Sequence, residues 1–241
     1  MGSYDLIEVQ QTRFVIFADI LGFASLVINC PPLDEESFAD TKVGRVYTQF
    51  HRLLQEVVDE ARRDTAGRTI TVIGFSDSAF IACGHSDDAL DIAAELMRRL
   101  IRARIPCRMG IAQGGFRVVK YQQELSTHTA VHSAHFTGTA VVQAHYAENV
   151  GYKGMRIIVG GVLGFHLRHS SRPSVLPPHL PDLPEYNHLQ ELNYLTGTDE
   201  DDHLCTAVME MSSSAESHVR RHYDDTLSAM ERMRSALGSS A

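Results

Sequence analysis

Residues 14–23 read Phe-Val-Ile-Phe-Ala-Asp-Ile-Leu-Gly-Phe, and this segment is the most informative part of the sequence about the fold. Phe14 to Ile20 is an apolar, β-rich run with Asp19 near its end, which is typical of a buried strand. Gly22 follows at once, and a glycine in this place indicates a turn, here into a short helix. The pattern therefore predicts a carboxylate at the end of a buried strand.

A second carboxylate, Asp77, occupies a predicted hairpin. Two strand-like runs, Arg68 to Phe75 and Ser78 to Cys83, are joined by a tight turn that contains it. If the first strand lies beside this hairpin, Asp19 and Asp77 converge, and paired carboxylates are what Mg²⁺ and Mn²⁺ require. Either aspartate alone also fits a turn or helix cap. Together, in this strand context, they favour a metal site.

The turn that follows Asp19 is a candidate phosphate site. Leu21, Gly22 and Phe23 open the short helix, and the first N–H groups of a helix have no partner inside it. Such groups can hold a triphosphate.

The rest of the first 165 residues alternates helical and strand-like patterns. We expect helices over 38–61, 87–105 and 137–149, a strand over 155–159, and a pair of strands over 108–113 and 116–121 broken by Gly114 and Gly115. This order predicts an α/β (α+β) fold, in which helices pack on a mixed sheet. The predicted domain covers residues 1–165.

Residues 166–241 form a predicted extension. Five of the eight prolines fall between Pro173 and Pro184, so this segment is neither regular helix nor central strand, and we expect a surface excursion. Ala215 to Leu237 is rich in good helix formers with apolar residues at one-turn intervals, which predicts a C-terminal helix. It can be a docked terminal helix or a dimer strut.

Composition narrows the class of partner and compartment. The 30 acidic residues outnumber the 22 basic ones, so the overall field repels a nucleic-acid backbone or an anionic membrane surface. The four cysteines are far apart, with no CxxC, which fits a reducing compartment. No apolar leader or membrane-length run is present. We expect a cytoplasmic protein with no nucleic-acid or membrane partner.

Four motifs resemble one known family. Residues 17–23 resemble the FxDIxGF signature of class III adenylate and guanylate cyclases, and residues 76–79 resemble the second motif of that family, usually GDxxxA. Residues 108–114 are similar to its R(V/M)GIxxG strand, and residues 138–141 to the start of its GxxVNxAxR helix. The resemblance covers roughly residues 14–160, in the family's order and spacing.

The resemblance implies a ferredoxin-like βααββαβ catalytic core in a homodimer. Two Mg²⁺ or Mn²⁺ ions would be bound by Asp19, Asp77 and the carbonyl of Ile20, with catalysis by these two aspartates. The reaction turns a nucleoside triphosphate into a 3′,5′-cyclic monophosphate and pyrophosphate. In the family each active site is shared between two chains, which meet head to tail.

At two positions the sequence departs from the residues with which the family recognises the base. Purine cyclases read it with a Lys–Asp or Glu–Cys pair, and Ile73 and His135 stand at those positions. A short cyclase domain with altered purine readers resembles the pyrimidine cyclases of bacterial antiphage Pycsar systems, whose cyclic product acts on a separate effector. The implied substrate is UTP, and the implied product is cyclic UMP. His135 can donate to a uracil carbonyl, or it is a surface residue beside the helix.

At two further positions the sequence departs from the residues with which the family stabilises the transition state. Val142 and Tyr146 replace the Asn and Arg that steady it in the family, so Tyr146 is the nucleotide-facing residue expected of that helix. The missing cation then comes from elsewhere, with Lys153 and Arg156 as candidates, or the site is inactive. The alternatives are a purine or cytidylate cyclase, or a silent cyclase-like protein that binds nucleotide. Retention of both aspartates opposes the silent alternative, because clustered acids repel each other.

Overall fold

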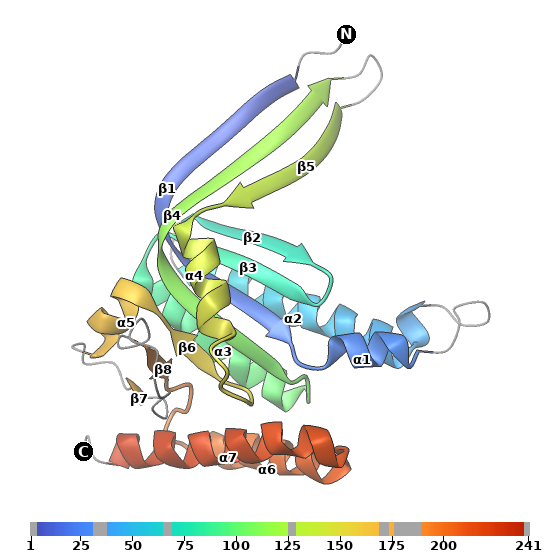
Figure 1. Ribbon diagram of the computed structural model, residues 1–241, viewed down its shortest axis with the longest axis vertical. Helices are drawn as coiled ribbons and strands as arrows, with labels where there is room; N and C mark the ends of the chain where they lie inside the picture. Colours follow the sequence, from blue (N-terminus) through green and yellow to red (C-terminus); the bar gives the residue numbers. More distant parts are fainter. Residues whose placement is uncertain are drawn as a thin grey trace.

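The computed structural model describes residues 4–30, 38–64, 69–124, 129–168, 174–175 and 189–238 (Figure 1). Side chains are described for the same residues except 4–10, 119–135, 168 and 174–175. Within this part the chain forms one mixed sheet of eight strands with packed helices. The predicted fold class is thus confirmed.

The sheet brings the first strand between the hairpin and the glycine-rich strand. The order is β2, β3, β1, β4, β6, β8, β7, and β5 pairs with β4. The pairing of β4 with β6 is parallel and the other pairings are antiparallel. The strands are β1 Tyr4–Ile20, β2 Ile70–Phe75, β3 Ser78–Cys83, β4 Cys107–Glu124, β5 Thr129–Thr137, β6 Ile157–Val159, β7 Ser174–Val175 and β8 Gln190–Leu192.

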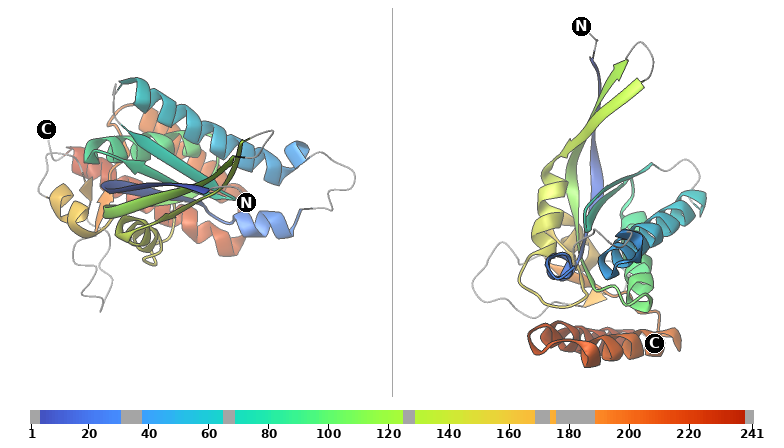
Figure 2. Two further views of the ribbon diagram at one scale, coloured as in Figure 1. Left: turned by 90° about the horizontal axis from the view of Figure 1, so that it is seen from above. Right: turned by 90° about the vertical axis from the view of Figure 1, so that its right-hand side faces the viewer.

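Helices cover both faces of the sheet (Figure 2). They are α1 Phe23–Ile28, the 3₁₀ helix η1 Phe38–Asp40, α2 Lys42–Asp64, α3 Ser86–Arg102, α4 Thr139–Glu148, α5 Gly161–Arg168, α6 Glu200–Ser214 and α7 Ser217–Gly238. Ile16 and Ala18 of β1 pack into the main core with α2 and α3, whereas Val15 and Phe17 pack with α4. Successive side chains of β1 alternate between the two faces, so both are buried.

The glycine-rich strand differs from the prediction. The expected break at Gly114 and Gly115 is wrong, because β4 runs unbroken from Cys107 to Glu124 and pairs with β1 through both glycines. A Cβ on Gly114 would lie 2.5 Å from Thr139 Oγ1 and 2.8 Å from Ala140 N. The N–H of Gly115 donates to Thr139 Oγ1 at 2.9 Å. The glycines therefore allow α4 to approach the strand closely and do not mark a turn.

The far halves of β1 and β4 join β5 in an arm of three strands that extends away from the body of the protein (Figure 1). β5 was not predicted as a separate strand. It pairs with β4 over residues 117–124.

Helices α6 and α7 form a hairpin at the opposite end of the molecule from the arm (Figure 1). Leu204 and Met230 are fully buried in the main core, so α7 is docked, which is one of the two alternatives for the predicted C-terminal helix. Helix α6 was not predicted. The hairpin also holds a loop. The N–H of Met155 donates to Thr226 Oγ1 at 2.9 Å, and Gly154, at φ 95°, leaves no room for a Cβ against the same oxygen.

The extension is continuous with the rest of the fold. β8 pairs with β6, and Leu192 lies in the main core, so no break in the core accompanies the division at residue 165, which stays a prediction. Most of the proline-rich excursion lies outside the described residues. None of the described helices combines the length and the apolar character needed to cross a membrane.

Candidate active site

The two predicted metal-binding aspartates lie side by side. Asp19 is opposite Ser78 in the pairing of β1 with β3, and the N–H of Ile20 donates to the carbonyl of Asp77 at 3.0 Å. The hydroxyl of Ser78 donates to Asp19 Oδ1 at 2.6 Å, which orients that carboxylate. The convergence expected from the strand ends is therefore present.

The electrostatics of Asp19 favour a cation. Burial raises the pKa of Asp19, and so does repulsion from Asp77, while the hydrogen bond from Ser78 and the charges of Arg108 and His145 lower it. The net direction is upward, so the metal-free site resists full ionisation of Asp19. A divalent cation would reverse that penalty.

The donor set fits a hard cation, because Asp19, Asp77 and the Ile20 carbonyl offer only oxygen. Among the described residues no group of three or more His, Cys, Asp and Glu is placed to hold a metal ion. Water or substrate oxygens would therefore complete the coordination shell. A bound triphosphate supplies such oxygens.

The turn that carries Asp77 is held from α2. Ser76 lies in the left-handed region, at φ 50°, which shapes the tight connection between β2 and β3. His51 Nε2 donates to the carbonyl of Ser76 at 2.9 Å, and the His51 ring lies 4.5 Å from that of Tyr47. The long helix thereby fixes the position of the second aspartate.

The candidate phosphate turn has the predicted shape. Leu21 donates its N–H to the carbonyl of Pro106 at 2.8 Å, and Gly22 sits at φ 77°, where a glycine is favoured. Phe23 is buried and begins α1. The turn thus places the first N–H groups of α1 next to the end of β1.

Arg108 is the charged residue beside Asp19 that sequence reasoning used only as part of a motif. It pairs with Asp19 across β1 and β4, so both side chains lie on one face of the sheet. Its guanidinium forms an ion pair with Glu148 and donates from Nη1 to the carbonyl of Tyr152 at 3.3 Å. Burial raises the pKa of Glu148, against the lowering effect of Arg108. The strand alternation could have identified Arg108, whereas nothing local indicates Glu148.

The predicted base and transition-state residues come from three different elements. Ile73, in β2, is half-buried against the cluster that contains Phe17 and Phe80. His135 is in β5 opposite Val119, and its side chain lies outside the described residues. Tyr146, on α4, is 61% exposed in the single chain.

One candidate for the missing cation is wrong. Arg156 is 3% exposed and donates from Nε and Nη2 to the two carboxylate oxygens of fully buried Glu191, at 2.5 Å each. It also lies over the Tyr152 ring, 4.7 Å from its centroid. Arg156 is therefore engaged within the fold. Lys153 is exposed and remains a candidate.

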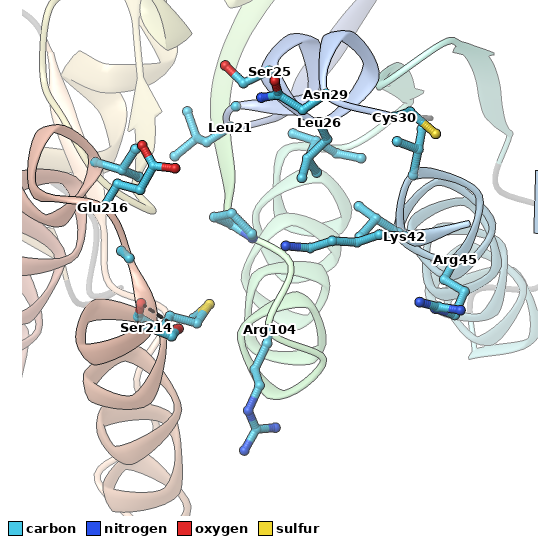
Figure 3. Close-up of a pocket in the computed structure, with 18 of the residues that line it drawn as sticks. Leu21, Ser25, Leu26, Asn29, Cys30, Lys42, Arg45, Arg104, Ser214 and Glu216 are labelled. Carbon is cyan, nitrogen blue, oxygen red and sulfur yellow. Dashed lines mark hydrogen bonds between the residues drawn. The ribbon is translucent and has the colours of Figure 1, made fainter. Parts of the chain in front are cut away.

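A cleft of about 1270 Å³ lies behind the phosphate turn, between α1, the start of α2 and the α6–α7 hairpin (Figure 3). Leu21 and Gly22 line one part of it, and Figure 3 shows Leu26 and Lys42 directed into it. The α6–α7 hairpin therefore lies across the cleft from α1, the helix that follows Asp19.

Comparison with solved structures then supplies the decisive observation. A crystal structure of the guanylyl cyclase Cya2 matches 80% of this chain and 94% of its own, with a TM-score of 0.53 and 16% identity. The chain has the fold of a class III nucleotide cyclase catalytic domain. A bacterial light-regulated adenylyl cyclase matches 86% of this chain and 99% of its own, with a TM-score of 0.50 and 12% identity.

No protein-family model matches the sequence, and no curated protein matches it. At these identities the structural likeness establishes the fold alone.

Proposed function

We propose that the chain is a nucleotide cyclase that converts a nucleoside triphosphate into a 3′,5′-cyclic monophosphate and pyrophosphate. The observation that carries the proposal is the position of Asp19 beside Asp77. Asp19 lies opposite Ser78 in β3, and the N–H of Ile20 donates to the carbonyl of Asp77. A fold with no use for metal would gain nothing from two neighbouring acids that repel each other.

Each residue of the site has a separate role in this proposal. Asp19, Asp77 and the Ile20 carbonyl would hold two Mg²⁺ or Mn²⁺ ions. Bound there, these ions would acidify the ribose 3′-hydroxyl and neutralise charge on the triphosphate. Ser78 keeps the Asp19 carboxylate in one orientation. Arg108, on the same face, is placed to attract the negative charge that moves onto the leaving pyrophosphate.

The turn at Leu21, Gly22 and Phe23 would hold the far phosphates through the N–H groups of Gly22 and Phe23, because the N–H of Leu21 already donates to the carbonyl of Pro106. Positioning of this kind supplies much of the rate in phosphoryl transfer, because no covalent intermediate with the protein is needed.

UTP is the proposed substrate. The apolar side chain of Ile73 packs against the cluster that contains Phe80 and offers no hydrogen bond to a purine. His135 would donate a hydrogen bond to a uracil carbonyl. By resemblance to the Pycsar cyclases, cyclic UMP would act in the cytoplasm on a separate effector in antiphage defence. A purine or cytidylate cyclase is the enzyme alternative.

A homodimer with two shared sites is the proposed assembly. Val142 and Tyr146 are 51% and 61% exposed on one helix, and exposed apolar side chains of this size are typical of surfaces that a partner covers. Each site would take its aspartates from one chain and its α4 side chains from the other. The absence of Asn and Arg at these two positions favours the second candidate function, a silent nucleotide-binding regulator.

Incubation with Mn²⁺ and each of the four nucleoside triphosphates, followed by mass spectrometry of the products, tests the proposal. We expect cyclic UMP from UTP, and no product with Asp77→Ala. Asp64→Ala, which removes an exposed acid at the end of α2, is the matched control and should keep full activity. If the folded wild type forms no cyclic product from any of the four, the cyclase proposal is wrong. If ATP competes equally with UTP, only the base assignment fails.

A further inference from the structure

A histidine of α4 lies over the strand that carries the first metal-site aspartate. The centroid of the His145 ring is 5.2 Å from that of Phe17 in β1. Phe17 and Asp19 are two positions apart on one strand, so their side chains point to the same face and lie about 7 Å apart. His145 is therefore a close neighbour of the metal site, with room between the two for a phosphate group.

The electrostatics of two carboxylates place His145 on the same side of α4. Burial raises the pKa of Asp19 and of Glu148, and the charge of His145 is among the opposing effects that lower both. Glu148 is three residues after His145, on the same side of the helix, and pairs with Arg108, which lies opposite Asp19. His145 thus faces the sheet near the level of Asp19.

The ring of His145 is available to a ligand. The residue is exposed, and among the described side chains neither of its ring nitrogens has a hydrogen-bond partner. An imidazole carries at least one N–H donor whether it is neutral or charged. The next residue, Tyr146, is turned about 100° around the helix and is 61% exposed. Helix α4 therefore presents His145 toward its own aspartates and Tyr146 away from them.

The order of the site along β1 assigns one phosphate to this donor. The turn at residues 21–23 lies beyond Asp19, on the side away from Phe17. A triphosphate whose far phosphates meet that turn, and whose metal ions meet Asp19, therefore has its α-phosphate toward Phe17 and His145. The apolar cluster against which Ile73 packs contains Phe17 and lies on this side as well. The base and the α-phosphate would then share one end of the site.

We propose that His145 donates a hydrogen bond to the α-phosphate of a triphosphate bound at Asp19 and Asp77 of its own chain, and so supplies part of the stabilisation that Tyr146 does not. The inference rests on the proposed function of that site. Charge on the α-phosphate oxygens shifts as the 3′-oxygen attacks and pyrophosphate leaves, and an N–H fixed beside them lowers the barrier. Helix α4 would contribute to two sites, through His145 to its own and through Tyr146 to that of the partner subunit.

His145→Leu removes the donor at an exposed position and keeps a good helix former, so the variant should fold. We expect kcat to fall about 100-fold, the lower range for loss of one donor to a developing charge. Titration calorimetry with Mg²⁺ and the α,β-methylene analogue of UTP, or of whichever triphosphate is turned over fastest, gives the second readout. Its dissociation constant should rise about tenfold, as for one lost hydrogen bond to a charged group. Inorganic pyrophosphate lacks the α-phosphate, so its affinity should not change.

The matched control is His203→Leu, which removes an exposed histidine of α6. It should change neither kcat nor the affinity for the analogue. His145→Gln keeps an N–H donor and should recover part of the loss seen with leucine.

Mixed dimers show which chain's histidine serves a site. If His145 acts on its own chain's site, a dimer of Asp77→Ala and His145→Leu subunits carries one lesion in each site, and no activity returns beyond that left by His145→Leu. Asp77→Ala with Tyr146→Ala should regain activity under the same conditions, because those two lesions fall in one site. Neighbouring residues of one helix should thus give opposite results.

Recovery to about a quarter of wild-type activity with His145→Leu would place the histidine at the site of the partner subunit and overturn the proposal. An unchanged kcat or analogue affinity in the folded Leu variant would do the same, as would a Gln variant as impaired as the Leu variant, or no analogue binding by the wild type. The calorimetric readout needs no turnover. Weaker analogue binding by His145→Leu in a protein without cyclase activity would therefore support His145 as a phosphate ligand and reject the cyclase proposal.

Discussion

Replacing Arg156 with Met removes one half of a buried ion pair, and the result distinguishes a structural arginine from a catalytic one. Glu191 has no exposure to solvent, so its charge is not screened once Arg156 is gone. Breaking a buried pair by removing one partner costs about 3–5 kcal/mol. Arg232 Nη2 lies 3.6 Å from Glu191 Oε2 and can replace part of the lost contact. We therefore expect Arg156→Met to lower the free energy of unfolding by the smaller of these amounts, about 3 kcal/mol.

Replacing Glu191 should lower the free energy of unfolding more than replacing Arg156. Glu191→Gln leaves Arg156 buried with no counter-charge and with Arg232 as a like-charged neighbour, so we expect about 5 kcal/mol. For a chain of this size the two losses correspond to falls in Tm of about 6–12 °C and 10–20 °C. Urea denaturation followed by circular dichroism measures the free energies directly. A double replacement, Arg156→Met with Glu191→Leu, should recover much of the loss.

The activity of the folded variant completes the test. Arg156→Met should turn over substrate within a few-fold of the wild type at a temperature well below its Tm. A variant that unfolds like the wild type but has lost its activity would refute the reasoning. Arg156 would then act on the substrate, and the ion pair would have to open in the working enzyme.

Two other predictions concern the metal site and the assembly. The pKa of Asp19 is raised in the folded protein, so the metal-free protein loses stability as pH rises from the unfolded pKa through the folded one. At neutral pH, Asp19→Asn should therefore melt higher than the metal-free wild type and gain nothing from Mn²⁺; a lower melting temperature would contradict the assignment. Asp77→Ala and Tyr146→Ala, each inactive alone, should regain about a quarter of wild-type activity when their subunits are mixed, since half of the dimers then hold one intact site of two. No recovery despite proven subunit exchange would place each site within a single chain.

The sequence predicted well where the information is local. The hairpin strand Ser78–Cys83 was placed to the residue, because apolar residues run up to a polar turn at one end and to Gly84 at the other. Asp19 and Asp77 converge as expected, because Asp19 lies near the end of β1 and Asp77 directly precedes β3, which pairs with β1. The interpretation of Gly114 failed because a glycine that permits a close helix looks the same in sequence as one that permits a turn.

The remaining errors concern contacts between distant residues. A basic residue beside a strand is usually solvated, and nothing near Arg156 reveals that Glu191, 35 positions later, lies against it. The pair of Arg108 and Glu148 spans 40 positions in the same way. Such partners become visible only when the sheet order is known.

The hydrogen bond from Met155 to Thr226 determines whether the first 160 residues can be separated from the rest of the chain. The recognisable motifs end before residue 160, yet the loop that provides the Tyr152 carbonyl to Arg108 is held by α7, more than 70 positions further on. A shortened chain that keeps every motif would leave this loop without its anchor and the main core without Leu204 and Met230. The smallest piece that can be transplanted into another protein with its site intact therefore includes both helices of the hairpin.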